Sequence, residues 1–148
     1  MTSVRAAKAK GSAFEYDCQH SLSKIHPEIY RTSERGFQLQ YDLECDTAVF
    51  ECKRLKSMSW NQAKKYFVKL VDKLPESKLE LGKKFTPQKI PYLLFKSNQQ
   101  PCLVMYFNPI ENRIQVTEFE SGFGVPFEKH PSTRKAFSKD KAKEFWKD

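Results

Sequence analysis

The sequence predicts a single α/β domain in which helices pack against a β-sheet. Apolar residues recur at helical spacing in two segments, alternate with polar residues in a third, and form three strand-like runs near the end. The length of 148 residues fits one domain with one hydrophobic core. A hydrophobic content of 39% excludes a fully disordered chain.

The first helix is predicted from about Ser12 to His26. Ser12 and Glu15 have the spacing of a capping box, and Pro27 ends the segment. We expect residues 1–10 to form a flexible basic arm. The apolar face of the helix consists of Phe14, Cys18, Leu22 and Ile25.

Three strands are predicted next, at Ile29–Ser33, Phe37–Cys45 and Ala48–Leu55. In the second strand apolar and polar residues alternate strictly, which indicates one buried and one polar face. The last two strands are separated by a very short connection. They are therefore expected to pair as a hairpin.

A second helix is predicted from Trp60 to Leu74, with Ser59 as its N-cap and Pro75 as its stop. A loop is expected at Pro75–Lys89, and a basic tail after Pro126. The apolar stripe of the helix is Trp60, Ala63, Phe67, Leu70, Val71 and Leu74. The remaining predicted elements are strands at Tyr92–Phe95, Cys102–Phe107 and Arg113–Phe119 and a short helix near Lys139–Trp146.

The composition favours a polyanionic partner, most simply nucleic acid. The formal net charge is +8, and residues 51–90 carry eleven basic against four acidic side chains. The four cysteines form no CxxC pair and the three histidines show no metal-ligand spacing, which disfavours a zinc knuckle. The sequence contains no Gly-rich phosphate-binding loop, so we expect no nucleotide cofactor. Because neither a signal peptide nor a long apolar run is visible, we expect free thiols, a cytoplasmic location and no membrane partner.

The hairpin brings together side chains suited to phosphodiester hydrolysis. If Cys45 lies opposite Ala48, paired residue numbers sum to 93, and Asp42 lies opposite Glu51. Adjacent carboxylates repel each other unless a cation intervenes, and Mg²⁺ prefers such oxygen ligands. Lys53 shares the strand face of Glu51 and would stabilise developing negative charge. The alternative is an ordinary solvated face, because Glu-x-Lys is a common tripeptide.

These residues resemble the PD-(D/E)xK nuclease superfamily, and most closely its archaeal-type Holliday-junction resolvases, which phages also carry. The resemblance rests on Lys10-Gly-Ser-Ala-Phe-Glu15, Asp42 and Glu51-Cys-Lys53, with Arg31-Thr-Ser33 similar to a family Arg-Ser strand. It covers about residues 10–120. It implies a restriction-endonuclease-like core of helix, β-meander, helix and further strands with a mixed central sheet. The nuclease domain would then span 11–125, between an arm at 1–10 and a basic tail at 126–148.

The resemblance also implies roles for individual residues. Glu15, Asp42 and Glu51 would hold Mg²⁺ or its substitute Mn²⁺, and Lys53 would assist the nucleophile. The hairpin geometry adds the backbone carbonyl of Cys52, which is expected to point into the same region, as a further metal ligand. The protein would be a homodimer that resolves four-way DNA junctions, and it would act in the host cytoplasm if the chain is phage-encoded. The sequence departs from the family in having Tyr41 before Asp42 and a short spacing to Glu51. The residues expected to contact DNA are Lys10, Ser12, Arg31, Ser33, Arg35, Arg54, Lys56, Lys64, Lys65 and Tyr66.

Two other functions remain open. Gln62-x-x-x-Tyr66 resembles the motif that follows Glu-x-Lys in RecB-like exonucleases, where the Gln helps hold the active site. The same Gln62 also completes a capping box with Ser59, and we weigh the two roles equally. A non-catalytic, basic nucleic-acid-binding protein is the third interpretation.

Overall fold

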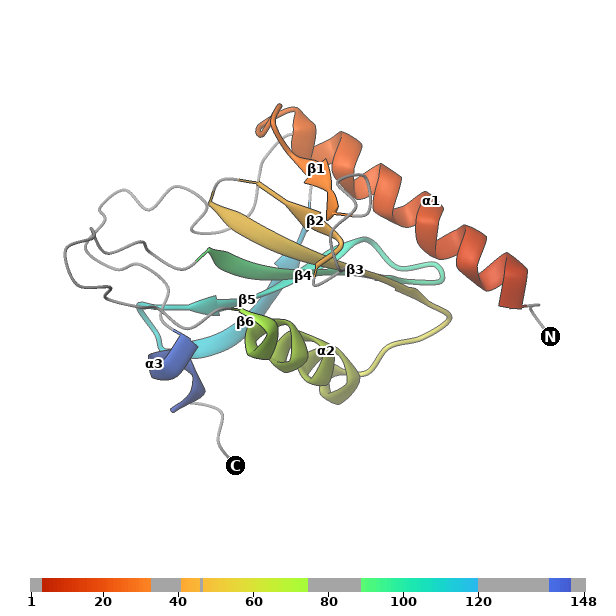
Figure 1. Ribbon diagram of the computed structural model, residues 1–148. Helices are drawn as coiled ribbons and strands as arrows, with labels where there is room; N and C mark the ends of the chain where they lie inside the picture. Colours follow the sequence, from red (N-terminus) through yellow and green to blue (C-terminus); the bar gives the residue numbers. More distant parts are fainter. Residues whose placement is uncertain (1–3, 33–40, 46, 75–88, 120–138, 145–148) are drawn as a thin grey trace.

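The computed structural model describes residues 4–32, 41–45, 47–74, 89–119 and 139–144, and within its helices the side chains of 4–12, 140 and 141 lie outside the description. The described chain forms a six-stranded sheet with helices on its two faces (Figure 1). The helices are α1 (Val4–Ser23), α2 (Trp60–Lys73) and α3 (Lys139–Lys143). The strands are β1 (Tyr30–Arg31), β2 (Leu43–Glu44), β3 (Ala48–Leu55), β4 (Ile90–Ser97), β5 (Leu103–Asn108) and β6 (Arg113–Glu118).

The sheet is mixed, and its strand order follows the order of the chain, from β1 to β6. Every neighbouring pair is antiparallel except β3 and β4, which run parallel. A parallel pair needs a crossover connection, and α2 lies within the one that joins these two strands. The predicted α/β class, with helices backing a sheet, is confirmed.

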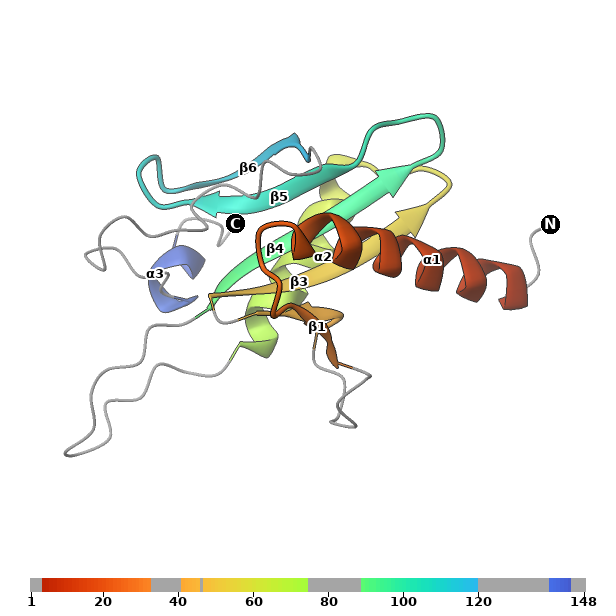
Figure 2. The same cartoon turned by 90° about the horizontal axis from the view of Figure 1, so that it is seen from above.

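The core lies between the sheet and the two long helices. Figure 2 looks down on the α1 side, and α2 lies on the opposite side of the central strands. Strand β4 is buried on both faces, because residues 90–95 are all buried in sequence. The helices contribute Phe14, Cys18 and Leu22 from α1 and Ala63, Phe67, Leu70 and Val71 from α2.

The predicted start of the first helix is wrong. Helix α1 begins at Val4, so Ser12 lies inside the helix instead of capping it, and residues 4–10 of the expected arm are helical. Residues 5–10 are all Arg, Ala or Lys, which are strong helix formers. The helix also ends three residues early, at Ser23, and the chain tightens there because the Ile25 N–H donates to the Leu22 carbonyl only three residues back, at 3.0 Å.

The second helix is close to its prediction. Ser59 is the N-cap of α2, and it forms a capping box with Gln62. The one error in the predicted apolar stripe is Trp60, which is half exposed. Its neighbours Asn61 and Gln62 are exposed too, so the first turn of α2 faces solvent and the buried stripe begins at Ala63.

The strands agree with their predictions to within a few residues where the structure describes them. Tyr41, Leu43 and Cys45 are buried while Asp42 and Glu44 are less so, which confirms the alternation in this part of the second predicted strand. The rest of that strand, the 75–88 part of the expected loop and most of the tail fall outside the described residues. None of the described helices is long and apolar enough to cross a membrane.

Candidate active site

The hairpin register agrees with the prediction. Leu43 pairs with Phe50 and Glu44 with Val49, so paired residue numbers sum to 93. Asp42 is the residue just before β2, where the backbone bends. The ladder of paired residues ends at Leu43, but the negative charge of Asp42 lies close enough to Glu51 to raise the pKa of that carboxyl group. The short connection between β2 and β3 therefore fixes the predicted hairpin register, and a direct pairing of Asp42 with Glu51 stays a prediction.

Asp42 is held by three hydrogen bonds to backbone groups, two in β3 and one in the residue that follows β1. Its N–H donates to the carbonyl of Phe50 at 3.1 Å, and its carbonyl accepts from the N–H of Thr32 at 3.1 Å. Its carboxylate oxygen Oδ2 accepts from the backbone N–H of Cys52 at 2.8 Å. The neighbouring Tyr41 hydroxyl donates to the carbonyl of Lys73 at the end of α2, at 3.3 Å. This carboxylate is thus positioned by backbone groups rather than by a flexible partner.

Glu51 lies in the middle of β3 with its side chain only 11% exposed. Its Oε1 is 3.6 Å from the Lys53 ammonium, and its Oε2 is 3.6 Å from the Lys73 ammonium. Both distances are too long for direct hydrogen bonds. Oε2 is buried and accepts no hydrogen bond from any described group. The carboxylate is thus balanced in charge but has an oxygen available for a further ligand.

Burial raises the pKa of Glu51 above its ordinary value, and the nearby negative charge of Asp42 raises it further. The ammonium groups of Lys73 and Lys53 act in the opposite direction. The net rise means that the ionised form is costly here. An additional cation beside Asp42 and Glu51 would relieve that cost.

Lys73 is a member of the site that the sequence did not identify. It is not among the residues of the second helix that were expected to contact DNA, which are Lys64, Lys65 and Tyr66. Its position at the last turn of α2 brings it to Glu51. The helix runs back along β3, so Lys53 likewise lies against α2, with its ammonium 5.0 Å from the centre of the Tyr66 ring.

Glu15 does not join Asp42 and Glu51 in a compact set. Its Oε1 accepts from Arg31 Nε at 3.0 Å, and both side chains are largely buried. The Arg31 guanidinium also lies 4.0 Å from the centre of the Tyr16 ring. Glu15 of α1 thus already forms an ion pair with Arg31 of β1. No sequence pattern signals this pair, because its partners come from separate elements.

Cys52 has its backbone turned toward Asp42 and its thiol turned toward α1. Because the N–H and C=O of one strand residue point to the same neighbour, its carbonyl oxygen also faces the Asp42 side. Its side chain packs against the hydrophobic core, to which Cys18 of α1 belongs. A hydrogen bond to Cys18 and then burial raise the pKa of Cys102, and all four cysteines are free thiols.

The residues expected to contact DNA are spread over several elements. Arg54 donates to the Ser97 carbonyl at 3.4 Å and to Asn98 Oδ1 at 3.5 Å, which ties β3 to the end of β4. Lys56 lines a pocket of about 370 Å³ at the same end of these strands, together with Met58 and Phe95.

On α2, Lys65 is exposed, whereas Lys64 and Tyr66 are half-buried. Lys10 and Ser12 lie in α1 with side chains outside the description, and Ser33 and Arg35 lie outside the described residues.

Gln62 has a structural role in helix capping. Its N–H donates to Ser59 Oγ at 3.2 Å, and its Oε1 accepts from the Ser59 N–H at 3.1 Å. The side-chain oxygen is therefore occupied at the start of α2. This confirms the capping interpretation and leaves the catalytic one as a prediction.

Potential ligands also gather away from the candidate active site. In the part of the chain that the structure describes, one group of at least three His, Cys, Asp or Glu residues has its ligand atoms all within 4.8 Å of one another. It consists of His26, Glu28 and Cys45. Glu15, Asp42 and Glu51 do not meet this criterion.

Comparison with known proteins gives no relative from which a function could be transferred. No family model matches the chain, and neither a curated protein nor a solved structure matches it.

Proposed function

We propose that this chain is a metal-dependent endodeoxyribonuclease that acts on branched DNA, with paired cleavage of four-way junctions as its reaction. The observation that carries the proposal is the pairing of β2 with β3, which positions Asp42 beside the Glu51–Lys53 strand. The order of helix, three-strand meander, helix and further strands agrees with a restriction-endonuclease-like core.

The site suits a hard divalent cation. Asp42 and Glu51 offer carboxylate oxygens, and the Cys52 carbonyl faces the same region. Glu51 Oε2, which is buried without a hydrogen bond from a described group, is the oxygen most in need of a ligand. A bound Mg²⁺ or Mn²⁺ would lower the pKa of a water and neutralise charge on the phosphate. In this proposal Glu15 supports Arg31 instead of binding the metal.

The lysines would have a second role once DNA is bound. The side chains of Lys53 and Lys73 are 34% and 43% exposed, so both reach solvent while remaining beside Glu51. A phosphate at this position would attract both ammonium groups as negative charge develops on its oxygens. The exposed Lys65 and Lys69 on α2 extend the positive surface and would contact the DNA backbone independently of sequence.

A homodimer is part of the proposal. Two opposed strands of a four-way junction must be cut in a coordinated manner, and one chain offers a single Asp42–Glu51 pair. Two symmetric copies would supply two sites.

The direct test is cleavage of a labelled immobile four-way junction beside a linear duplex with the same arms, in Mg²⁺ and in EDTA. Paired, symmetric, Mg²⁺-dependent nicks on the junction alone are expected. Asp42→Asn and Glu51→Gln should lose cleavage and keep junction binding. Glu118→Gln, which alters an exposed carboxylate on β6, is the matched control and should cleave normally. Retained cleavage in both site variants would refute the assignment.

A RecB-like exonuclease is the second candidate, and the contact of Lys53 with Tyr66 favours it. Gln62→Glu separates the two roles of Gln62, because Glu at this position also completes a capping box. Exonuclease activity on linear ends that falls in Gln62→Glu, with the unfolding free energy unchanged, would support this candidate. Salt-dependent DNA binding without hydrolysis in any divalent metal would instead identify a non-catalytic binding protein.

A further inference from the structure

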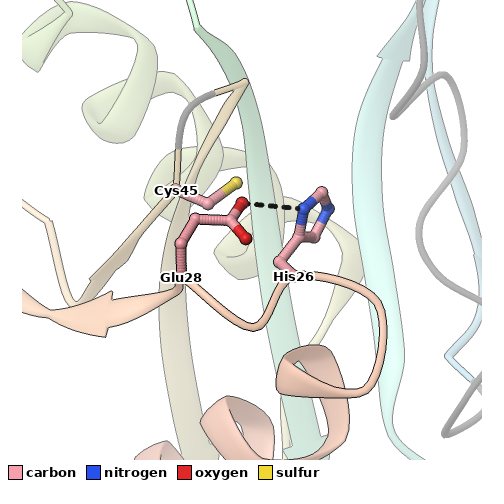
Figure 3. A group of neighbouring side chains, drawn as sticks. All are labelled: His26, Glu28 and Cys45. Atoms are coloured by element: carbon pink, nitrogen blue, oxygen red, sulfur yellow. Dashed lines mark ion pairs between the residues drawn. The ribbon is translucent and has the colours of Figure 1, made fainter.

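Three potential metal ligands of different chemistry converge beside the end of α1. The Nδ1 atom of His26 is 3.4 Å from Glu28 Oε1, and the Cys45 thiol completes a group whose ligand atoms lie within 4.8 Å of one another. Figure 3 shows the three side chains pointing toward a common centre. His26 and Glu28 come from the turn after α1, and Cys45 follows β2.

The backbone fixes all three positions. The His26 N–H donates to the Leu22 carbonyl at 2.8 Å, and the His26 carbonyl accepts from Ile29 at 3.0 Å. This turn holds Glu28 beside His26. The Cys45 N–H donates to Ala48 at 3.0 Å, which anchors the thiol at the β2–β3 connection. Backbone hydrogen bonds therefore fix these positions, and binding an ion there requires little ordering of the described residues.

The donor set identifies the class of ion. A thiolate, an imidazole and a carboxylate are ligands that Zn²⁺ takes in tetrahedral sites, whereas Mg²⁺ takes oxygen ligands. Cys45 is 2% exposed, and the Glu28 side chain is 45% exposed, so the group has one closed and one open side. We propose that His26, Glu28 and Cys45 form a Zn²⁺ site, with water or another donor as the fourth ligand on the open side.

Such a site would cross-link two parts of the fold, because it would join the end of α1 to the β2–β3 hairpin. Cys45 lies at the opposite end of β2 from Asp42, so the bound metal would also stabilise the hairpin that positions the Asp42 carboxylate. The proposal stands independently of the nuclease assignment, because it uses none of the residues of the candidate active site.

The test is a titration of the reduced full-length chain with Co²⁺, followed by displacement with Zn²⁺. We expect one equivalent of Co²⁺ to give a thiolate-to-cobalt charge-transfer band that Zn²⁺ abolishes. Cys45→Ser should lose the band. Cys102→Ser, which alters another thiol of the fold, should keep it. Absence of the band in the parent chain, its persistence in Cys45→Ser, or its loss in Cys102→Ser would overturn the proposal.

Glu28→Gln provides a second test in case the Cys45 variant misfolds, because Glu28 is exposed and its replacement leaves the core intact. Far-ultraviolet circular dichroism should be unchanged, and Zn²⁺ affinity should fall at least about tenfold, since even residues outside the ligand shell change affinity by that much. Unchanged affinity in Glu28→Gln would contradict its role as a ligand. Asp42→Asn should bind Zn²⁺ like the parent chain, which keeps this test separate from that of the nuclease.

Discussion

Replacement of Glu51 by Gln should stabilise the chain at neutral pH while removing the carboxylate that the proposed chemistry needs. The substitution keeps the size and shape of the side chain and removes its charge. Because that charge is 11% exposed and lies near Asp42, its removal relieves two unfavourable contributions. The proposed function thus predicts an inactive variant that is more stable than its parent.

The size of the effect follows from the surroundings of the carboxylate. Desolvation of a fully buried ion costs several kcal/mol, and partly exposed pairs with Lys53 and Lys73 return only about 0.2–1 kcal/mol each. We therefore expect Glu51→Gln to gain about 1–2 kcal/mol of unfolding free energy at neutral pH. In a chain of this size each kcal/mol raises the melting temperature by about 2–4 °C.

The stability gain of Glu51→Gln over the parent should increase as pH rises. The pKa of Glu51 is higher in the folded than in the unfolded chain, so the folded state binds more protons in the interval between the two values. The stability of the parent therefore falls as pH rises from the ordinary pKa of Glu, about 4.3, through the higher folded value. Glu51→Gln lacks this loss. Its advantage over the parent should grow across that interval and then remain constant.

Urea denaturation of both proteins between pH 4 and 8 measures this difference, with circular dichroism and tryptophan fluorescence as independent probes. Glu118→Gln serves as the control for loss of one negative charge at an exposed position. The reasoning would be refuted by a Glu51→Gln variant that is less stable than the parent at neutral pH. A stability difference that is independent of pH would refute it equally.

Three further predictions concern the ends of α2. Ser59→Ala removes the N-cap hydroxyl and should cost about 0.5–2 kcal/mol in urea denaturation; an unchanged midpoint would show that the cap contributes nothing. Lys139→Met removes a buried ammonium that donates to the carbonyls of Asp72 at 3.1 Å and Leu74 at 2.9 Å, and should cost about 1–3 kcal/mol by thermal unfolding. Lys143→Met, which breaks a partly exposed pair with the Asp72 carboxylate, should cost less than about 1 kcal/mol, and equal losses in the two lysine variants would contradict this ranking.

The parts of the fold that sequence analysis located best are those with strong local signals. Strand β3 and helix α2 have clear periodicity, and the helix has a capping residue at Ser59. The short connection after Cys45 was enough to give the hairpin register. The start of α1 was misplaced because the capping-box pattern at Ser12 outweighed the helix-forming residues before it. A local motif is not a boundary where the flanking sequence also favours the helix.

The candidate site was predictable only within the hairpin. Asp42, Glu51 and Lys53 are related by strand alternation and register, which the sequence carries. The ion pairs of Lys73 with Glu51 and of Arg31 with Glu15 depend on how helices pack on the sheet. No spacing in the sequence encodes these contacts. The same holds for the convergence of His26 with Cys45, which lie on different elements.

The two lysines beside Glu51 give the site its own internal counter-ions. If a divalent cation binds Asp42 and Glu51, it must compete with these ammonium groups, which weakens its affinity for the DNA-free protein. DNA phosphates would draw the lysines away and lift that competition. By linkage, the cation would then strengthen DNA binding by the same factor as DNA strengthens cation binding. Such coupling would delay full assembly of the site until substrate is present.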